Sequence, residues 1–369
     1  MAVFFKNKKK EVEEEFPNTL LGFGYEFSKD GKIQNVKTGE GFQFVAREGD
    51  LAYNQMHYEA LGEVVTTEVY KLLESECQLK KAPVPYNSQG EEEGTFIFLS
   101  DDALSNPDKL LVLIHGSGVV RAGQWSRRLI INDSLKSGTQ IPFIKEAQKE
   151  GYGIVVTNTN DNSRPGKGRI KGSQNPESHA HHVWNHYIHN AKARHVAIVA
   201  HSYGGCVVTS LFTQVKEEFR KRVFAVALTD SVHYLHEAGP FKGLVKVSKN
   251  WVCSPEPLDT PVKTHPGDIT RVSAGVTVHE QTSWASFSSI FKFLRERLAA
   301  VKEDAEGTGK GDGRGRGEER KNLPTSKNER RENPPEGQQK GGAGDQGVNE
   351  KKSEEKEEKD EAKKMRMDT

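Results

Sequence analysis

Four apolar segments of the chain end in residues that could carry out chemistry together. KLLVLI runs into HGSG at 115–118, and HVAIVA runs into HSYGG at 201–205. VFAVALT ends in Asp230, and the strand-like ITRVSAGV is followed by His279. Because the carboxyl ends of parallel strands lie along one edge of a sheet, residues far apart in the sequence can converge there. We therefore expect a single site at that edge.

The segment Ala200-His201-Ser202-Tyr203-Gly204 fits the nucleophile-elbow pattern G-x-S-x-G, with Ala at the first small position. A serine on this turn adopts a strained backbone conformation, which requires small residues on both sides. The N–H of Tyr203 would face a developing oxyanion, and a second N–H would come from Gly116 or Ser117. Ser202 is the predicted nucleophile.

A serine needs a base and an orienting acid to become a good nucleophile. The chain order Ser, Asp, His is that of α/β-hydrolases, and Ser202, Asp230 and His279 supply it. His279 would take the proton of Ser202, while Asp230 would fix the imidazole tautomer and stabilise the imidazolium.

Structural interpretations of the same residues stay open at this point. S-x-G after an apolar strand also begins ordinary helices, and Asp230, followed by Ser231, could simply cap a helix. His233, His236 and His265 compete with His279 as the base. The choice of His279 rests on its place after the last expected strand.

The elements that must position these residues alternate between strand and helix over roughly residues 16–301. KLLVLI, YGIVV, HVAIVA and VFAVALT are continuous apolar runs, which are typical of strands covered on both faces. YEALGEVVTTEVYKLLESE and SWASFSSIFKFLRERLA carry helical periodicity, and Asp30-Gly31 predicts a hairpin turn. The fold class is therefore α/β: an α/β-hydrolase-like, mostly parallel sheet flanked by helices.

Composition divides the 369 residues into three parts. Residues 1–15 are expected to be a flexible N-terminus, 16–301 the α/β domain, and 302–369 a disordered tail, because the tail mixes Gly, Pro and both charges with almost no aliphatic side chains. The 53 basic and 52 acidic residues nearly cancel, so no sequence-specific nucleic-acid binding is expected. The sequence shows neither a signal peptide nor a membrane span, and its 3 scattered cysteines favour a reducing compartment.

No metal or cofactor is expected. Five histidines crowd the segment 179–189, and His182, His186 and His189 would share a helix face, but no Cys or carboxylate stands at ligand spacing. RPGKGRIKG lacks the spacing of a phosphate-binding loop. Arginines at 121–128 could bind an anion or lie along apolar surface.

Long stretches of the chain resemble the Argonaute-binding (Arb-type) domain family. These stretches are LLVLIHGSGVVRAGQWSRRLIIN, SGTQIPFIK, VAHSYGG, VALTDSVH and SAGVTVHEQTSWASFSSIFKF. The resemblance implies an α/β-hydrolase-like fold with a serine nucleophile at Ser202. It also implies a nuclear and cytoplasmic regulator or adaptor that links an Argonaute protein and a chromodomain helicase at chromatin to alternative splicing. The alternative is an active serine hydrolase, esterase-like or thioesterase-like, on an unknown acyl substrate.

Overall fold

A nine-stranded sheet forms the centre of the molecule. The computed structural model describes residues 3–6, 13–88, 93–235 and 238–309. The strands of the sheet, from one edge to the other, are β5 (Lys80–Val84), β6 (Thr95–Leu99), β8 (Gly153–Val156), β7 (Lys109–Ile114), β11 (His195–His201), β12 (Val223–Thr229), β13 (Ser248–Val252), β15 (Arg271–Ser273) and β14 (Pro261–Val262).

The six strands from β8 to β15 pair in parallel, whereas β6 is antiparallel to both of its neighbours and β14 is antiparallel to β15. From β5 to β15, the exchanged positions of β7 and β8 and the reversed strand β6 give the strand order of an α/β-hydrolase sheet. The predicted fold class is confirmed.

Helices cover both faces of this sheet, because alternate side chains of each apolar strand point to opposite sides. Leu111, Leu113, Ala197 and Val199 belong to one buried cluster, and their neighbours Val112 and Ile198 belong to the other. The first cluster includes residues of α1 (Leu51–Ser75), α2 (Arg127–Asn132), α4 (Ile141–Lys149) and α10 (Phe287–Gly309). The second includes residues of α5 (Pro176–Val183), the π-helical turn η1 (Trp184–Ile188), α6 (Gly204–Gln214), α7 (Lys216–Arg222) and α8 (Ala238–Val247).

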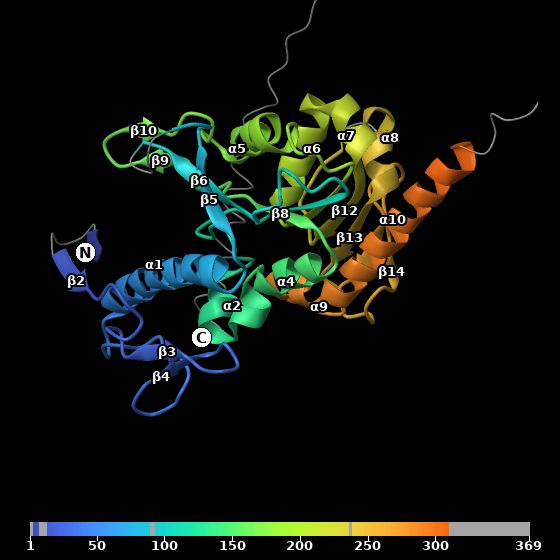
Figure 1. Ribbon diagram of the computed structural model, residues 1–369. Coiled ribbons are helices and arrows are strands. Elements are labelled where there is room, and N and C mark those ends of the chain that lie inside the picture. The colour runs from blue at the N-terminus through green and yellow to red at the C-terminus, as the bar shows by residue number, and fades with distance from the viewer. Residues whose placement is uncertain (1–2, 7–12, 89–92, 236–237, 310–369) are drawn as a thin grey trace, which may run out of the picture. The chain divides into compact units, whose positions relative to one another are not determined.

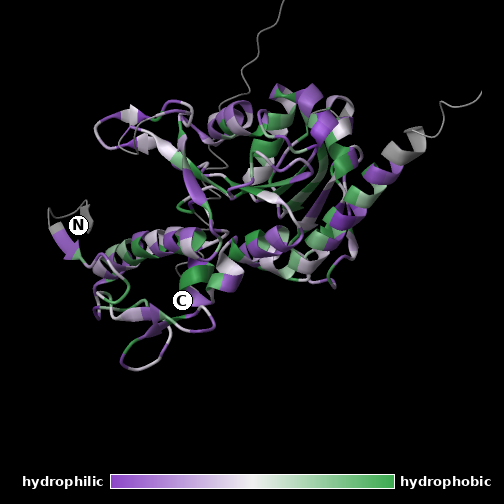
Figure 2. Ribbon diagram, in the orientation of Figure 1, coloured by the Kyte–Doolittle hydropathy of each residue, from purple (hydrophilic) through white to green (hydrophobic). Residues whose placement is uncertain are grey.

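The resulting three layers are visible in Figure 1, where α6, α7 and α8 lie on one side of β12 and β13, and α10 lies on the other. In Figure 2 the strands at the centre are hydrophobic, while the outer faces of the helices carry hydrophilic residues. The carboxyl ends of the parallel strands therefore form one edge between two helical layers. No helix in the described part of the chain is long and apolar enough to cross a bilayer.

Small elements lie outside the main sheet. Three two-stranded antiparallel pairs join β1 (Val3–Lys6) to β2 (Glu13–Phe16), β3 (Tyr25–Phe27) to β4 (Ile33–Asn35), and β9 (Ser163–Arg164) to β10 (Gly168–Arg169). Gly31, with φ of 76°, turns the chain between β3 and β4, so the hairpin predicted at Asp30-Gly31 is confirmed. Short helical turns complete the fold: α3 (Leu135–Gly138), η2 (His279–Gln281) and α9 (Thr282–Ala285).

The expected boundaries at 15 and 301 differ from the element ends. Residues expected to form a flexible N-terminus include β1 and most of β2, which pair with each other. At the other end, α10 continues past 301 to Gly309. Val301 is the last residue of this helix that packs as a partly buried apolar side chain against the core. The rest of the predicted tail, 310–369, lies outside the described residues.

Candidate active site

Ser202 lies on a strained turn between β11 and α6. Its φ is 53°, in the left-handed region that side chains other than glycine rarely adopt. Two backbone hydrogen bonds fix the turn: the Ser202 N–H donates to Thr229 O over 2.9 Å, and Gly205 N–H donates to Ser202 O over 3.1 Å. The sequence-predicted elbow therefore has the backbone strain that its small residues imply, and the bond to Thr229 places Ser202 beside the end of β12.

The glycines of the elbow are required by close contacts. A Cβ on Gly204 would lie 3.0 Å from Ile114 O, 3.1 Å from His115 O and 3.3 Å from the methyl group of Ala200. A Cβ on Gly205 would lie 1.7 Å from Ser231 Oγ and 2.8 Å from its Cβ. The turn thus packs backbone against the ends of β7 and β12, with no room for a side chain.

Replacement of Gly205 tests this packing. We expect Gly205→Ala to destabilise the protein by about 1–3 kcal/mol, the usual cost of overpacking, because Ser231 must move. Ser231→Gly removes both clashing atoms and leaves His233 Cβ at 3.6 Å, an ordinary contact. In that background Gly205→Ala should cost little in chemical denaturation. An equal cost in both backgrounds would show that the clash with Ser231 is not the cause.

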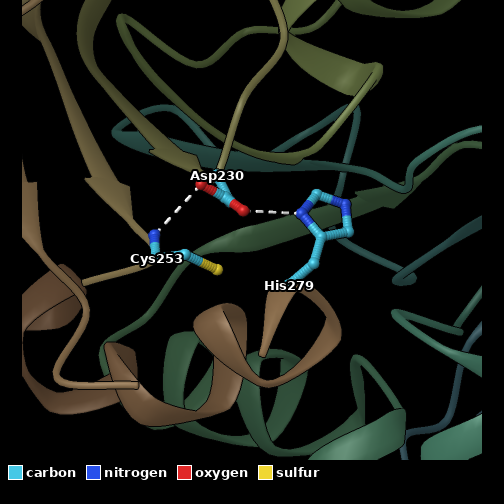
Figure 3. Close-up of side chains that lie close together, drawn as sticks. All are labelled: Asp230, Cys253 and His279. Carbon is cyan, nitrogen blue, oxygen red and sulfur yellow. Dashed lines mark hydrogen bonds and ion pairs between the residues drawn. The ribbon is translucent and has the colours of Figure 1, made fainter. Parts of the chain in front are cut away.

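Asp230 and His279 are hydrogen-bonded to each other. His279 Nδ1 lies 2.7 Å from Asp230 Oδ2, and Asp230 Oδ1 accepts a bond of 3.0 Å from the backbone N–H of Cys253 (Figure 3). Burial alone would raise the pKa of Asp230, but the hydrogen bonds from His279 and Cys253 outweigh it and lower this pKa to about 2. Asp230 is therefore a carboxylate at neutral pH, suited to orient an imidazole through Nδ1.

The structure decides between the alternative roles that the sequence left open. Asp230 caps no helix, because the described residues that follow it up to 235 are not helical. His233 is held away from the site, with Nδ1 2.7 Å from Ser231 Oγ and Nε2 3.0 Å from Asp268 Oδ1. His265 is exposed in the loop before β15, and His236 lies outside the described residues. His279 is the histidine that contacts Asp230.

The Ser202 hydroxyl makes no hydrogen bond within the described residues. The ring of His279 lies 4.6 Å, centroid to centroid, from the ring of His201, the residue before Ser202. His201 is buried with Nδ1 3.1 Å from Thr229 Oγ1, and burial, followed by repulsion from His279, lowers its pKa to about 3. A neutral His201 thus packs against His279 beside the elbow. Hydrogen bonds between a nucleophile and its base are often loose before substrate binds.

Among the described residues, the backbone N–H groups of Gly116, Ser117 and Tyr203 donate to no backbone carbonyl outside the regular helices and strands. The Gly116 carbonyl is 2.8 Å from His115 Nδ1 and accepts from Asn160 Nδ2 at 2.9 Å. Since the two groups of a trans peptide point in opposite directions, the Ser117 N–H points away from Asn160. A Cβ built on Gly116 would lie 3.1 Å from Ser202 Cβ, so this loop touches the elbow. Such N–H groups, beside the N-terminus of α6, can stabilise an oxyanion.

Two further predictions concerned histidines and arginines. His179 is buried between Asn158 N–H and Ser173, and the π-helical turn at 184–188 interrupts the regular spacing of the other histidines. Arg127 is buried and pairs with Glu63 over 2.9 Å, so it is unavailable to a partner.

Within the described chain, the Asp, Glu, Cys and His side chains close enough to hold a metal together are those of Asp230, Cys253 and His279. Sequence reasoning missed Cys253, because the strand before it, β13, was not recognised.

Known protein families and relatives match most of the chain, including the stretches that carry the site. The model of the Arb2 domain matches residues 16–165 and 161–258. "Cotranscriptional regulator ARB2A" of Mus musculus is 46% identical over 349 residues, covering 79% of this chain and 84% of its own. A relative from Homo sapiens, ARB2BP, is 32% identical over 324 residues, covering 76% of this chain and 90% of its own. Among solved structures, the histone deacetylase Clr3 superposes with a TM-score of 0.45 and 14% identity, over 64% of this chain and 39% of that one.

Proposed function

The chain belongs to the Arb2 domain family, and from that membership we propose that it is a cotranscriptional regulator. The observation that carries this proposal is identity of 46% with a regulator of that name over 79% of the chain. The matched stretches include the elbow, the loop at 115–118 and the segment of Asp230. The shared sequence therefore extends well beyond one site.

We further propose that the protein acts as an adaptor between an Argonaute protein and a chromodomain helicase, in the nucleus and the cytoplasm, with an effect on alternative splicing. The resemblance of the sequence to its family supports these partners. The nearly balanced charge of the chain supports contacts with proteins rather than sequence-specific contacts with nucleic acid. The exposed hairpin of β9 and β10 carries Lys167, Arg169 and Lys171 and is a suitable contact surface for an acidic partner.

Partner recovery separates the adaptor role from chemistry at Ser202. The double change Arg169→Glu with Lys171→Glu should lower recovery of Argonaute with the tagged protein about fivefold, equivalent to about 1 kcal/mol. Ser202→Ala should leave recovery unchanged, since it removes only a hydroxyl group that does not belong to the hairpin. Lys242→Glu, an exposed change on α8, is the matched control. Equal recovery from the hairpin variant and this control would refute the hairpin as the contact.

A second function is favoured by the hydrogen bond between Asp230 and His279. We propose that Ser202 attacks an acyl carbon of an ester, thioester or acyl-amide while His279 accepts the hydroxyl proton. Asp230 would hold the imidazole by Nδ1 and stabilise its charged form, and the N–H groups of Ser117 and Tyr203 would bind the oxyanion. His279 then gives its proton to the leaving group, and water releases the acyl group by the same steps. The regulator and the hydrolase are compatible in one chain.

A further inference from the structure

Asp230, Cys253 and His279 place an oxygen, a sulfur and a nitrogen ligand atom around one point of the sheet edge. The three side chains come from the ends of β12 and β13 and from the turn η2, and Figure 3 shows them facing one another. We propose that they form a binding site for a divalent transition-metal ion of the zinc class, which switches off the chemistry of Ser202.

The distances suit such an ion after a small adjustment. The ligand atoms all lie within 4.8 Å of one another. Tetrahedral zinc, with Zn–S near 2.3 Å and Zn–N or Zn–O near 2.0–2.1 Å, separates its ligand atoms by about 3.3–3.6 Å. The hydrogen-bonded pair at 2.7 Å must therefore open slightly. His279 can move, because its side chain is 41% exposed and lies on a turn of three residues.

The ion can reach the cluster and has ligands of the right chemical type. Asp230 and Cys253 are half-buried, so the site is open to solvent on one side. A carboxylate, a thiolate and an imidazole favour zinc or cobalt over magnesium or calcium, which prefer oxygen ligands alone. Three protein ligands leave the fourth position to water. On binding, the Cys253 thiol releases its proton to solvent, and the proton on His279 Nδ1 moves to Nε2 through water, so Nδ1 binds the metal through its lone pair.

The effect of the metal on Ser202 follows because Asp230 and His279 would serve both as metal ligands and as the acid and base of the triad. This effect, unlike the metal site itself, rests on the proposed hydrolase function. A metal on Nδ1 breaks the hydrogen bond from His279 to Asp230, and protonation of Nε2 removes the lone pair that would accept the Ser202 proton. Zinc therefore competes with the base function of His279. Cys253 makes no contact with the reacting atoms in the acyl-transfer steps described above, and its backbone N–H, which bonds to Asp230, is unchanged in Cys253→Ser.

Cobalt absorption tests the site without reference to activity. Titration of the full chain with Co²⁺ should produce the near-ultraviolet charge-transfer band of a cobalt-bound thiolate, and Zn²⁺, but not Mg²⁺, should remove it. Cys253→Ser should abolish the band, while Cys206→Ser and Cys77→Ser, which change the other two cysteines, should keep it. A band that survives in Cys253→Ser, or a native protein without any band, would overturn the proposal.

A labelling experiment then tests the consequence. In the native chain, Zn²⁺ should slow fluorophosphonate labelling of Ser202 at least tenfold, and in Cys253→Ser the ratio of rates with and without Zn²⁺ should be close to one. An equal zinc effect in both proteins would overturn the inhibitory role of this site. The failures are distinguishable, because a cobalt band in a chain that never labels would leave the metal site standing and remove the hydrolase.

Discussion

A fluorophosphonate probe is expected to label the native protein at Ser202 and to leave Ser202→Ala unlabelled. The elbow holds this serine at φ of 53° beside the end of β12, where no other hydrogen bond of the described chain occupies its hydroxyl. Phosphonylation requires an activated hydroxyl and a bound oxyanion, which the neighbouring His279 and the N–H groups of Ser117 and Tyr203 would supply. Mass spectrometry of the labelled peptide identifies the residue.

Variants of Asp230 and His279 measure how far these residues act together with Ser202 as one catalytic triad. His279→Ala and Asp230→Asn should each lower the labelling rate by about 10³- to 10⁴-fold, the loss found when a triad loses its base or has the wrong tautomer. His233→Ala is the matched control, because His233 bonds to Ser231 and Asp268 instead of Asp230. Labelling that persists in Ser202→Ala, or that His233→Ala abolishes as fully as His279→Ala does, would contradict the assignment.

Trp251→Ala is expected to destabilise the protein by about 3–5 kcal/mol, the usual cost of truncating a buried aromatic side chain. Trp251 is fully buried in β13 and packs edge-on against Phe293 of α10, with ring centroids 5.7 Å apart. Its Nε1 donates to Asp259 over 2.7 Å, and its carbonyl accepts the N–H of Asp230 over the same distance. The change removes both the largest side chain under α10 and a hydrogen bond.

Two comparison variants separate these contributions in urea denaturation. Trp251→Phe keeps most of the volume but loses the bond to Asp259, so we expect a loss of about 1–2 kcal/mol. Trp284→Ala changes a half-buried tryptophan whose ring is tilted by 33° against that of Phe287, and a loss of about 1 kcal/mol is expected there. If Trp251→Ala cost no more than Trp284→Ala, β13 would not be a central strand of the sheet.

Much of this arrangement could be predicted from the sequence, because its signals are local. Continuous apolar runs indicated β7, β8, β11 and β12, and the small residues around Ser202 indicated the elbow. Asp230 and His279 were chosen by their order along the chain, and the structure brings these two together. Their contact with each other depends on the sheet order, which places β12, β13 and β15 side by side.

What the sequence did not reveal depends on tertiary packing. β13 reads SKNWV, whose polar residues conceal a strand that pairs with β12 and β15. β5 contains Pro83, which is tolerated because this strand lies at the sheet edge. The segment from Gly204 to Arg222 forms two helices instead of one, separated at Val215. Cys253 had no visible role, since only the pairing of β13 places it beside Asp230.

The order of the parallel strands in the sheet has a consequence for how the chain folds. Residue 202 follows β11 and residue 279 comes after β15, and these two strands are connected in the sheet only through β12 and β13. Their meeting therefore requires pairings between segments far apart in the sequence. Such pairings have a high loop-closure cost and form slowly. A chain cut before β15 would still contain a complete elbow but no base. Reactivity at residue 202 would then report that the segment carrying residue 279 has docked, so a single covalent label would follow this step of folding.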